Sequence, residues 1–171
     1  MKKSQLVLAV VLLFSIVATA QEKWITKQID GKLSVSFPSE PKKETKNGID
    51  TYVVKEKDSI AYSVGTMDLK LVLKLDSTAL APLKDDPTFA KQLMEGMAST
   101  KLNYKFGEVT IGKWNTLTTY NVSAVDDTAK NVLSIQMIFL GSRLYVLTCR
   151  VPAALTTKKN ELFFNSLTLI K

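Results

Sequence analysis

Two neighbouring segments, residues 131–140 and 143–151, constrain the fold of this chain more than any other part of the sequence. Each alternates in the manner of a β-strand, yet each carries apolar side chains on both of its faces. Gly141-Ser142 between them is typical of a two-residue hairpin turn. A strand that is apolar on both faces belongs in the middle of a sheet that is covered from both sides. The sequence therefore requires two covering layers, one for each face.

Further strands are expected on the N-terminal side of this hairpin. Residues 32–37 alternate cleanly between apolar and polar side chains, and Pro38 ends that strand. Asn47-Gly48 predicts a tight turn that joins two extended stretches. The complete set of expected strands before the hairpin comprises 32–37, 42–46, 49–57, 60–68, 105–111 and 114–125, with Gly112-Lys113 as the turn between the last two.

Helical patterns lie before and after the main block of strands. Asp86-Pro87 is typical of an N-cap and a first-turn proline, and Phe89, Leu93 and Met97 then recur every four residues. Gly96 in this helix costs about 1 kcal/mol relative to alanine, which favours close backbone packing there. Shorter helices are expected at 77–83 and from Thr156 or Thr157 through Phe164. The predicted fold class is α+β, an α/β/α sandwich with a central, mostly antiparallel twisted sheet.

The first twenty residues have the layout of a secretory signal peptide. Lys2 and Lys3 precede an apolar run at 6–17, and Ala18-Thr19-Ala20 is a small-x-small cleavage pattern. We expect cleavage between Ala20 and Gln21, which leaves residues 21–171 as a single domain. The apolar run is short for a bilayer span, so no transmembrane segment is expected after cleavage, although an uncleaved anchor helix is the alternative. We therefore expect a periplasmic or secreted protein of a Gram-negative, Bacteroidetes-like bacterium.

Short motifs along the predicted mature region resemble those of one superfamily. They are Trp24, residues 30–38 with Glu40-Pro41 after them, the hairpin residues 141–147, and Phe163-Phe164-Asn165-Ser166-Leu167. Together they resemble the PsbP/Mog-like superfamily, which includes DcrB-like and other small exported bacterial proteins. The resemblance implies a fold that serves as a binding and scaffolding platform in unrelated processes. It carries no functional residue over to this chain.

The composition excludes most kinds of enzyme site. The chain has no histidine and one cysteine, so it lacks Ser-His-Asp and Cys-His arrangements, a Cys-x-x-Cys pair and the common zinc ligand sets. Cys149 lies in an apolar stretch and is expected to be a buried, inert thiol. The adjacent pairs Asp85-Asp86 and Asp126-Asp127 could join a calcium or magnesium site, but a helix cap and a hairpin loop account for them. We predict no catalytic, cofactor-binding or metal-binding residue and no cofactor.

Charge and short surface motifs bear on partners. The formal net charge is +7, but the lysines are spread along the chain, so we expect only weak attraction to anionic surfaces. The sequence has no basic stripe with interleaved aromatic residues, and nucleic acid is not an expected partner. Ser59, Ser77 and Thr128 each follow an aspartate in a pattern that resembles the O-glycosylation motif of exported Bacteroidetes proteins.

These observations favour a non-enzymatic binding or accessory module of the cell envelope, with another envelope protein as its partner. One alternative is a carrier of a small ligand or a cation, for which a concave pocket with a few polar groups would be the clue. The other is a hydrolase that uses carboxylate or serine groups brought together only by the fold.

Overall fold

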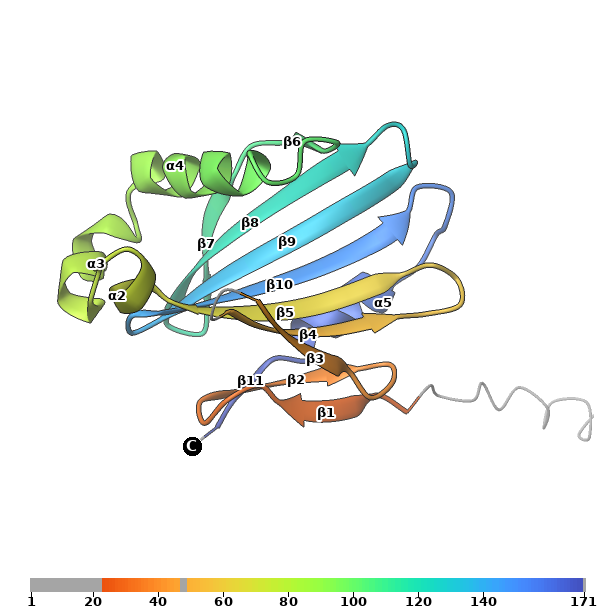
Figure 1. Ribbon diagram of the computed structural model, residues 1–171, viewed down its shortest axis with the longest axis horizontal. Coiled ribbons are helices and arrows are strands. Elements are labelled where there is room, and N and C mark those ends of the chain that lie inside the picture. The colour runs from red at the N-terminus through yellow and green to blue at the C-terminus, as the bar shows by residue number, and fades with distance from the viewer. Residues whose placement is uncertain (1–22, 47–48, 171) are drawn as a thin grey trace, which may run out of the picture.

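The computed structural model describes residues 23–46 and 49–170 (Figure 1). The predicted signal peptide, its cleavage site at Ala20 and Gln21, and the Asn47-Gly48 turn lie outside the described residues. Every strand pairing in the described chain is antiparallel.

The strands form two sheets. The larger has the order β3–β4–β5–β10–β9–β8–β6, and β7 also pairs with β8; the smaller has the order β1–β2–β11. The strands are β1 (Ile25–Gln28), β2 (Leu33–Phe37), β3 (Lys42–Lys46), β4 (Ile49–Lys55), β5 (Ala61–Asp68), β6 (Lys105–Phe106), β7 (Thr110–Trp114), β8 (Leu117–Asp126), β9 (Asn131–Leu140), β10 (Arg143–Pro152) and β11 (Thr168–Leu169).

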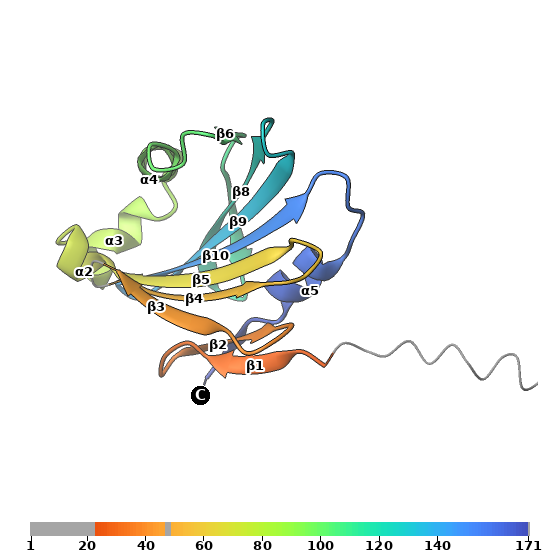
Figure 2. The ribbon, with the colours of Figure 1, turned by 45° about the vertical axis from the view of Figure 1, so that its right-hand side comes forward.

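Helices lie on both faces of the larger sheet. They are α2 (Leu69–Val72), α3 (Ser77–Leu83), α4 (Pro87–Ala98) and α5 (Lys159–Asn165). Figures 1 and 2 show α2, α3 and α4 on one side of the sheet, with α5 and the smaller sheet on the other. The α+β class and the mostly antiparallel central sheet are confirmed. The strand predicted at 32–37 forms in the smaller sheet, so one of the two covering layers combines a helix with strands.

Two hydrophobic cores lie on opposite faces of the larger sheet, and β10 contributes to both. Its Leu144 joins the core under α2, α3 and α4, which also holds side chains of β8 and β9. Its Tyr145, Leu147 and Cys149 join the core under α5 and the smaller sheet, which also holds side chains of β4 and β5. Ile138 of β9 joins this second core as well, so the division between the two covers is not complete at β10. The two-faced apolar pattern read at 143–151 is confirmed.

The two hairpin turns predicted after residue 110 have different outcomes. Gly141 has a φ of 63°, as a tight turn requires, and Leu140 pairs with Arg143 across it. The turn predicted at Gly112-Lys113 is wrong, because both residues lie within β7. The chain turns instead after Trp114, where Asn115 has a φ of 54°. Asparagine adopts this left-handed conformation more readily than most residues, which allows a turn without glycine.

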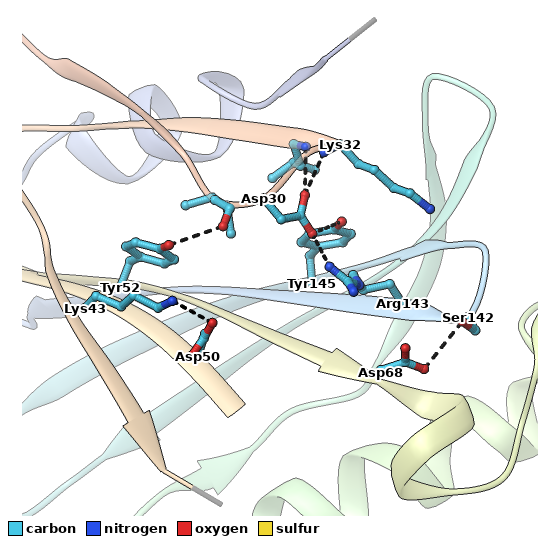
Figure 3. Close-up of polar contacts among 11 residues, drawn as sticks. Asp30, Lys32, Lys43, Asp50, Tyr52, Asp68, Ser142, Arg143 and Tyr145 are labelled. Carbon is cyan, nitrogen blue, oxygen red and sulfur yellow. Dashed lines mark hydrogen bonds and ion pairs between the residues drawn. The ribbon is translucent and has the colours of Figure 1, made fainter. Parts of the chain in front are cut away.

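One carboxylate joins the smaller sheet to β10 (Figure 3). Asp30, in the turn between β1 and β2, accepts a hydrogen bond from the Arg143 guanidinium at 2.7 Å and another from the Tyr145 hydroxyl at 2.6 Å. Its second oxygen accepts the backbone N–H groups of Lys32 at 2.8 Å and Leu33 at 3.2 Å. The side chain is 16% exposed. Asp30 thus fixes the turn and ties one covering layer to the central strand.

Ionised Asp30 is the form that these donors favour. Burial raises the pKa of the carboxyl group, but the hydrogen bonds from Tyr145, Arg143 and the Lys32 N–H, together with the charge of Arg143, hold the pKa below its ordinary value of 3.8. The unfolded chain therefore takes up this proton at a higher pH than the folded chain. The stabilisation by Asp30 is complete above the ordinary value and is lost as the pH falls through the lowered, folded-state value.

We expect Asp30→Ala to lower the free energy of unfolding by about 2 kcal/mol at neutral pH, because it leaves the buried Tyr145 hydroxyl and the Leu33 N–H without an acceptor and removes the ion pair with Arg143. The difference from the parent protein should shrink as the pH falls from about 5 to about 3. Urea unfolding followed by circular dichroism across this pH range measures both effects. Glu44→Ala, on the exposed strand β3, is the matched control. If the difference in free energy of unfolding between Asp30→Ala and the parent protein did not change with pH, the stabilising role of ionised Asp30 would be contradicted.

Candidate binding groove

A cavity of about 830 Å³ lies between α4 and the segment that runs from β6 into β7. Its volume falls within the range of ligand-binding pockets. The lining from the strand side comes from one continuous stretch, which includes Phe106, Val109 and Ile111. The lining from the helix consists of Pro87, Ala90, Lys91, Met94, Glu95 and Ala98. We refer to this cavity as the α4 groove.

The helix residues that line the α4 groove occur at the spacing of one helical face. Ala90 and Met94 are buried at its base, while Ala98 is half-buried further along. The sequence predicted that Phe89, Leu93 and Met97 face the core, and these side chains do pack against it, but only in part. The most buried residues of the helix, Ala90 and Met94, each lie one position after a residue that the sequence placed in the core. The helix thus has a second apolar side, which lines the groove.

Glycine 96 has a different environment from the one that the sequence indicated. A Cβ atom built there would meet no heavy atom within 4 Å, so the expected close backbone packing is wrong. The residue is exposed and does not line the α4 groove.

The start of α4 is fixed to the sheet by polar contacts. Asp86 accepts the N–H of Thr88 at 2.7 Å, which confirms the predicted N-cap. Asp85 accepts hydrogen bonds from Lys113 at 2.7 Å and from the Thr118 hydroxyl at 2.9 Å. The bond from Lys113 is the main cause of a lowered pKa of Asp85. These contacts link the loop before α4 to β7 and β8, and so set the distance between helix and strands.

Two backbone features shape the strand side of the groove. The N–H of Gly107 donates to the carbonyl of Ser123 at 2.9 Å, after which Glu108 and Val109 leave the pairing with β8 until β7 begins. A Cβ atom at Gly107 would lie 3.3 Å from that carbonyl oxygen, so a side chain there fits only if the backbone shifts by a few tenths of an ångström. In the described residues, no strand pairs with the outer edge of β6 or β7. This edge borders the α4 groove.

Charge is confined to the rim of the groove. Lys91 and Glu95 are exposed and lie 4.0 Å apart one helical turn from each other, a surface pair of little energetic weight. Glu108 is exposed on the opposite wall. The base is apolar, which suits apolar groups of a ligand, whereas the rim can pair with polar or charged groups.

The carboxylate pairs noted in the sequence do not converge. Asp85 and Asp86 hold the start of α4, Asp126 accepts the N–H groups of Thr128 and Ala129, and Asp127 pairs with Lys105 at 2.6 Å. Across residues 23–46 and 49–170, no group of three or more acidic or cysteine side chains could hold a metal ion. The same residues contain no helix with the length and apolar character needed to cross a membrane.

The remaining candidates are dispersed over the surface and the core. Ser59, Ser77 and Thr128 are exposed and lie in three separate turns or helix starts. Cys149 is fully buried, which confirms the expectation, and burial is the main cause that raises its pKa to about 12. The α4 groove was missed by sequence reasoning. Its one available signal was the run Ala90, Met94 and Ala98, a second apolar stripe beside the predicted one.

A partly buried cluster at the opposite side of the molecule has a structural role. Glu56 accepts hydrogen bonds from the Tyr62 hydroxyl at 2.7 Å and from Lys159 at 3.0 Å. Burial, followed by the contact with Glu56, raises the pKa of Tyr62. Because Lys159 begins α5, these bonds hold the helix against the loop between β4 and β5.

Comparisons with known proteins bear on the fold. A scan against protein-family models and a search of curated proteins find no match. The solution structure of cyanobacterial PsbP (CyanoP) from Synechocystis sp. PCC 6803 is similar, with a TM-score of 0.55, 12% identity, and coverage of 86% of this chain and 91% of that chain. A crystal structure from Bacteroides thetaiotaomicron VPI-5482 has a TM-score of 0.48 and 13% identity over 81% of this chain, which spans 45% of that protein. A Pseudomonas aeruginosa protein of unknown function has a TM-score of 0.43 and 8% identity, with 81% and 90% coverage.

We expect Gly96→Ala to raise the free energy of unfolding by about 0.5–1 kcal/mol, because alanine loses less backbone entropy in a helix and its methyl group meets no obstacle here. Chemical denaturation measures the change. Gly107→Ala is the contrasting variant, and we expect it to destabilise the protein through its approach to Ser123. Equal effects of the two substitutions would contradict this account of the helix and the groove.

Proposed function

We propose that this chain, whose fold is PsbP-like, is a non-enzymatic binding module of the bacterial cell envelope. In this proposal, the α4 groove holds an extended apolar segment of another envelope protein. The observation that carries the proposal is the position of an apolar cavity of about 830 Å³ directly beside a sheet edge with which none of the described strands pairs. Such a site offers side-chain pockets and backbone hydrogen bonds to the same ligand.

The two edges of the larger sheet differ in a way that supports this choice. At one edge, β3 has the sequence Lys-Lys-Glu-Thr-Lys, and all five residues are exposed. Charged side chains of this kind, lysine above all, discourage the addition of a further strand. At the other edge, β7 contains one lysine, and the half-buried Ile111 faces the α4 groove. A partner strand would therefore meet repulsion and desolvation at β3 and apolar contact at β7.

A small apolar ligand is the second candidate for the same groove. The apolar base formed by Ala90 and Met94, with Phe106 opposite, favours such a ligand. A peptide would in addition satisfy the free backbone groups of the neighbouring edge, which a small apolar molecule cannot do. This difference is the reason for preferring a protein segment.

We propose a non-enzymatic role because of the side chains that line the α4 groove. Its ionisable groups, Lys91, Glu95 and Glu108, are exposed on the rim, and they include no nucleophile paired with a base. The sequence supplies no histidine. Its one thiol, that of Cys149, is buried and does not line the α4 groove, so it cannot react with a ligand bound there. A binding role needs none of these groups.

Blocking the α4 groove should abolish specific partner binding. We expect Ala98→Phe to lower recovery of a crosslinked partner from envelope extract at least about tenfold after a high-salt wash, because the new ring occupies apolar space that the partner needs. Ala154→Phe, at an exposed position after β10, is the matched control and should behave like the parent protein.

Both variants should first be shown to unfold at the same denaturant concentration as the parent. Equal recovery of a salt-resistant partner with both would remove the groove from the interface. If Ala98→Phe instead abolishes extraction of a small apolar molecule, detected by mass spectrometry of the purified protein, the carrier function replaces the peptide-binding function.

Export and glycosylation can be tested together by one measurement. We propose periplasmic or secreted localisation after cleavage between Ala20 and Gln21, with Ser59, Ser77 and Thr128 as glycan acceptors at exposed positions in turns or at a helix start. The intact mass of protein from its producing cell should equal residues 21–171 plus sugar, and the triple alanine variant should lose the sugar mass. A mass equal to the full chain would contradict cleavage, and a bare polypeptide mass would contradict glycosylation.

A further inference from the structure

Five consecutive residues at one end of the molecule, Lys70 to Lys74, are all exposed. Three of them are large and apolar: Leu71 is 71% exposed, Val72 54% and Leu73 46%. We call residues 70–74 the apolar tip. Single exposed apolar residues are ordinary, but three in succession at an extremity are typical of a contact surface. Figures 1 and 2 both place α2 beside α3 at this end, beyond the strands.

The backbone holds these side chains outward. Leu69 before the tip is fully buried, and Leu75 after it packs against the same core. The N–H groups of Leu73 and Leu75 both donate to the carbonyl of Leu69, at 2.8 and 3.1 Å. Lys74 between them has a φ of 60°, a conformation that is uncommon for a lysine. The chain therefore bends sharply between two buried anchors, and the apolar residues on the bend cannot reach the core.

Positive charges lie on the outer surface of the apolar tip, and negative charges lie at its base. Lys70 and Lys74 flank the apolar residues, and among the described residues neither forms an ion pair. The neighbouring carboxylates are engaged with the backbone at the base. Asp68 accepts the N–H of Lys70 at 2.9 Å, and Asp76 accepts two N–H groups at the start of α3. The outermost surface thus combines apolar side chains with two cationic groups.

We propose that the apolar tip docks this protein on the surface of an anionic lipid bilayer. Leu71, Val72 and Leu73 enter the boundary between headgroups and acyl chains, while the ammonium groups of Lys70 and Lys74 contact lipid phosphates. Aliphatic lysine stems can lie along the apolar boundary with the charge in the headgroup layer. This inference goes beyond the proposed function and uses none of the residues of the α4 groove.

A lipid surface fits the tip better than a protein does. The tip is a short convex bend, whereas a specific protein interface buries about 800 Å² on each partner and needs a matching hollow. A bilayer deforms around a small apolar protrusion and needs no such hollow. With three apolar residues and two cations, binding should be weak, reversible and sensitive to salt.

The tip can be tested with one fluorophore, because the native Cys149 is buried. Val72→Cys introduces an accessible thiol for an environment-sensitive dye such as NBD, and Leu102→Cys, at a position 87% exposed, is the matched control. We expect vesicles of phosphatidylglycerol and phosphatidylethanolamine to raise and blue-shift the emission at position 72 but not at 102. The same change at both positions, or none at 72, would overturn the proposal.

Vesicle sedimentation of the protein as purified from its producing cell gives a second readout. We expect the double variant Leu71→Ser and Leu73→Ser to weaken vesicle binding about tenfold or more. The double variant Lys70→Gln and Lys74→Gln should weaken it about fivefold for each charge removed. Leu102→Ser should have no effect. All variants share the same N-terminal region, so their differences report the tip alone. Equal binding by the tip variants and Leu102→Ser would overturn the proposal, and capture of the groove's partner should be unchanged in every variant.

Discussion

The architecture depends on β10, the strand that both cores share. Its side chains alternate between two separate apolar environments, with Leu144 on one face and Tyr145, Leu147 and Cys149 on the other. A strand with two apolar faces is stable only when water is excluded from both, because each large side chain contributes about 1.5–3 kcal/mol when it is buried. The two covering layers are therefore requirements of one strand. Arg143 at the start of that strand donates a hydrogen bond to Asp30, which connects one cover to the strand directly.

The two covering layers are displaced from each other along the larger sheet, and this displacement leaves space for the α4 groove. Helices α2 to α4 protect the side of the sheet that contains β8 and β9, whereas α5 and the smaller sheet protect the side that contains β4 and β5. The uncovered faces accordingly carry polar residues, such as Asn121 and Gln136 on one and Ser63 and Thr148 on the other. Because α4 crosses the end of the sheet near its last strand, one side of this helix remains open and lines the groove.

Local patterns predicted the elements well where the physical cause is local. The alternation at 131–151, the cap at Asp86 and the turn at Gly141 depend on neighbouring residues, and each forms as expected. Prediction failed where the cause is distant or unusual. No local signal assigns residues 33–37 to a second sheet, since that depends on pairing with β11, far away in sequence. The turn at Asn115 and the bend at Lys74 use left-handed backbone without glycine, and neither was predicted from the sequence.

The reactivity of the single cysteine reports whether the chain is folded. While β10 stays between its covers, the thiol of Cys149 is inaccessible and remains protonated at any physiological pH, since burial raises its pKa to about 12. Once the strand leaves the sheet, the same thiol regains ordinary acidity and meets solvent. In an oxidising compartment it would then couple to another unfolded copy through a disulfide. Covalent dimers would consequently accumulate as more of the protein unfolds, and they would persist after the remaining molecules had refolded.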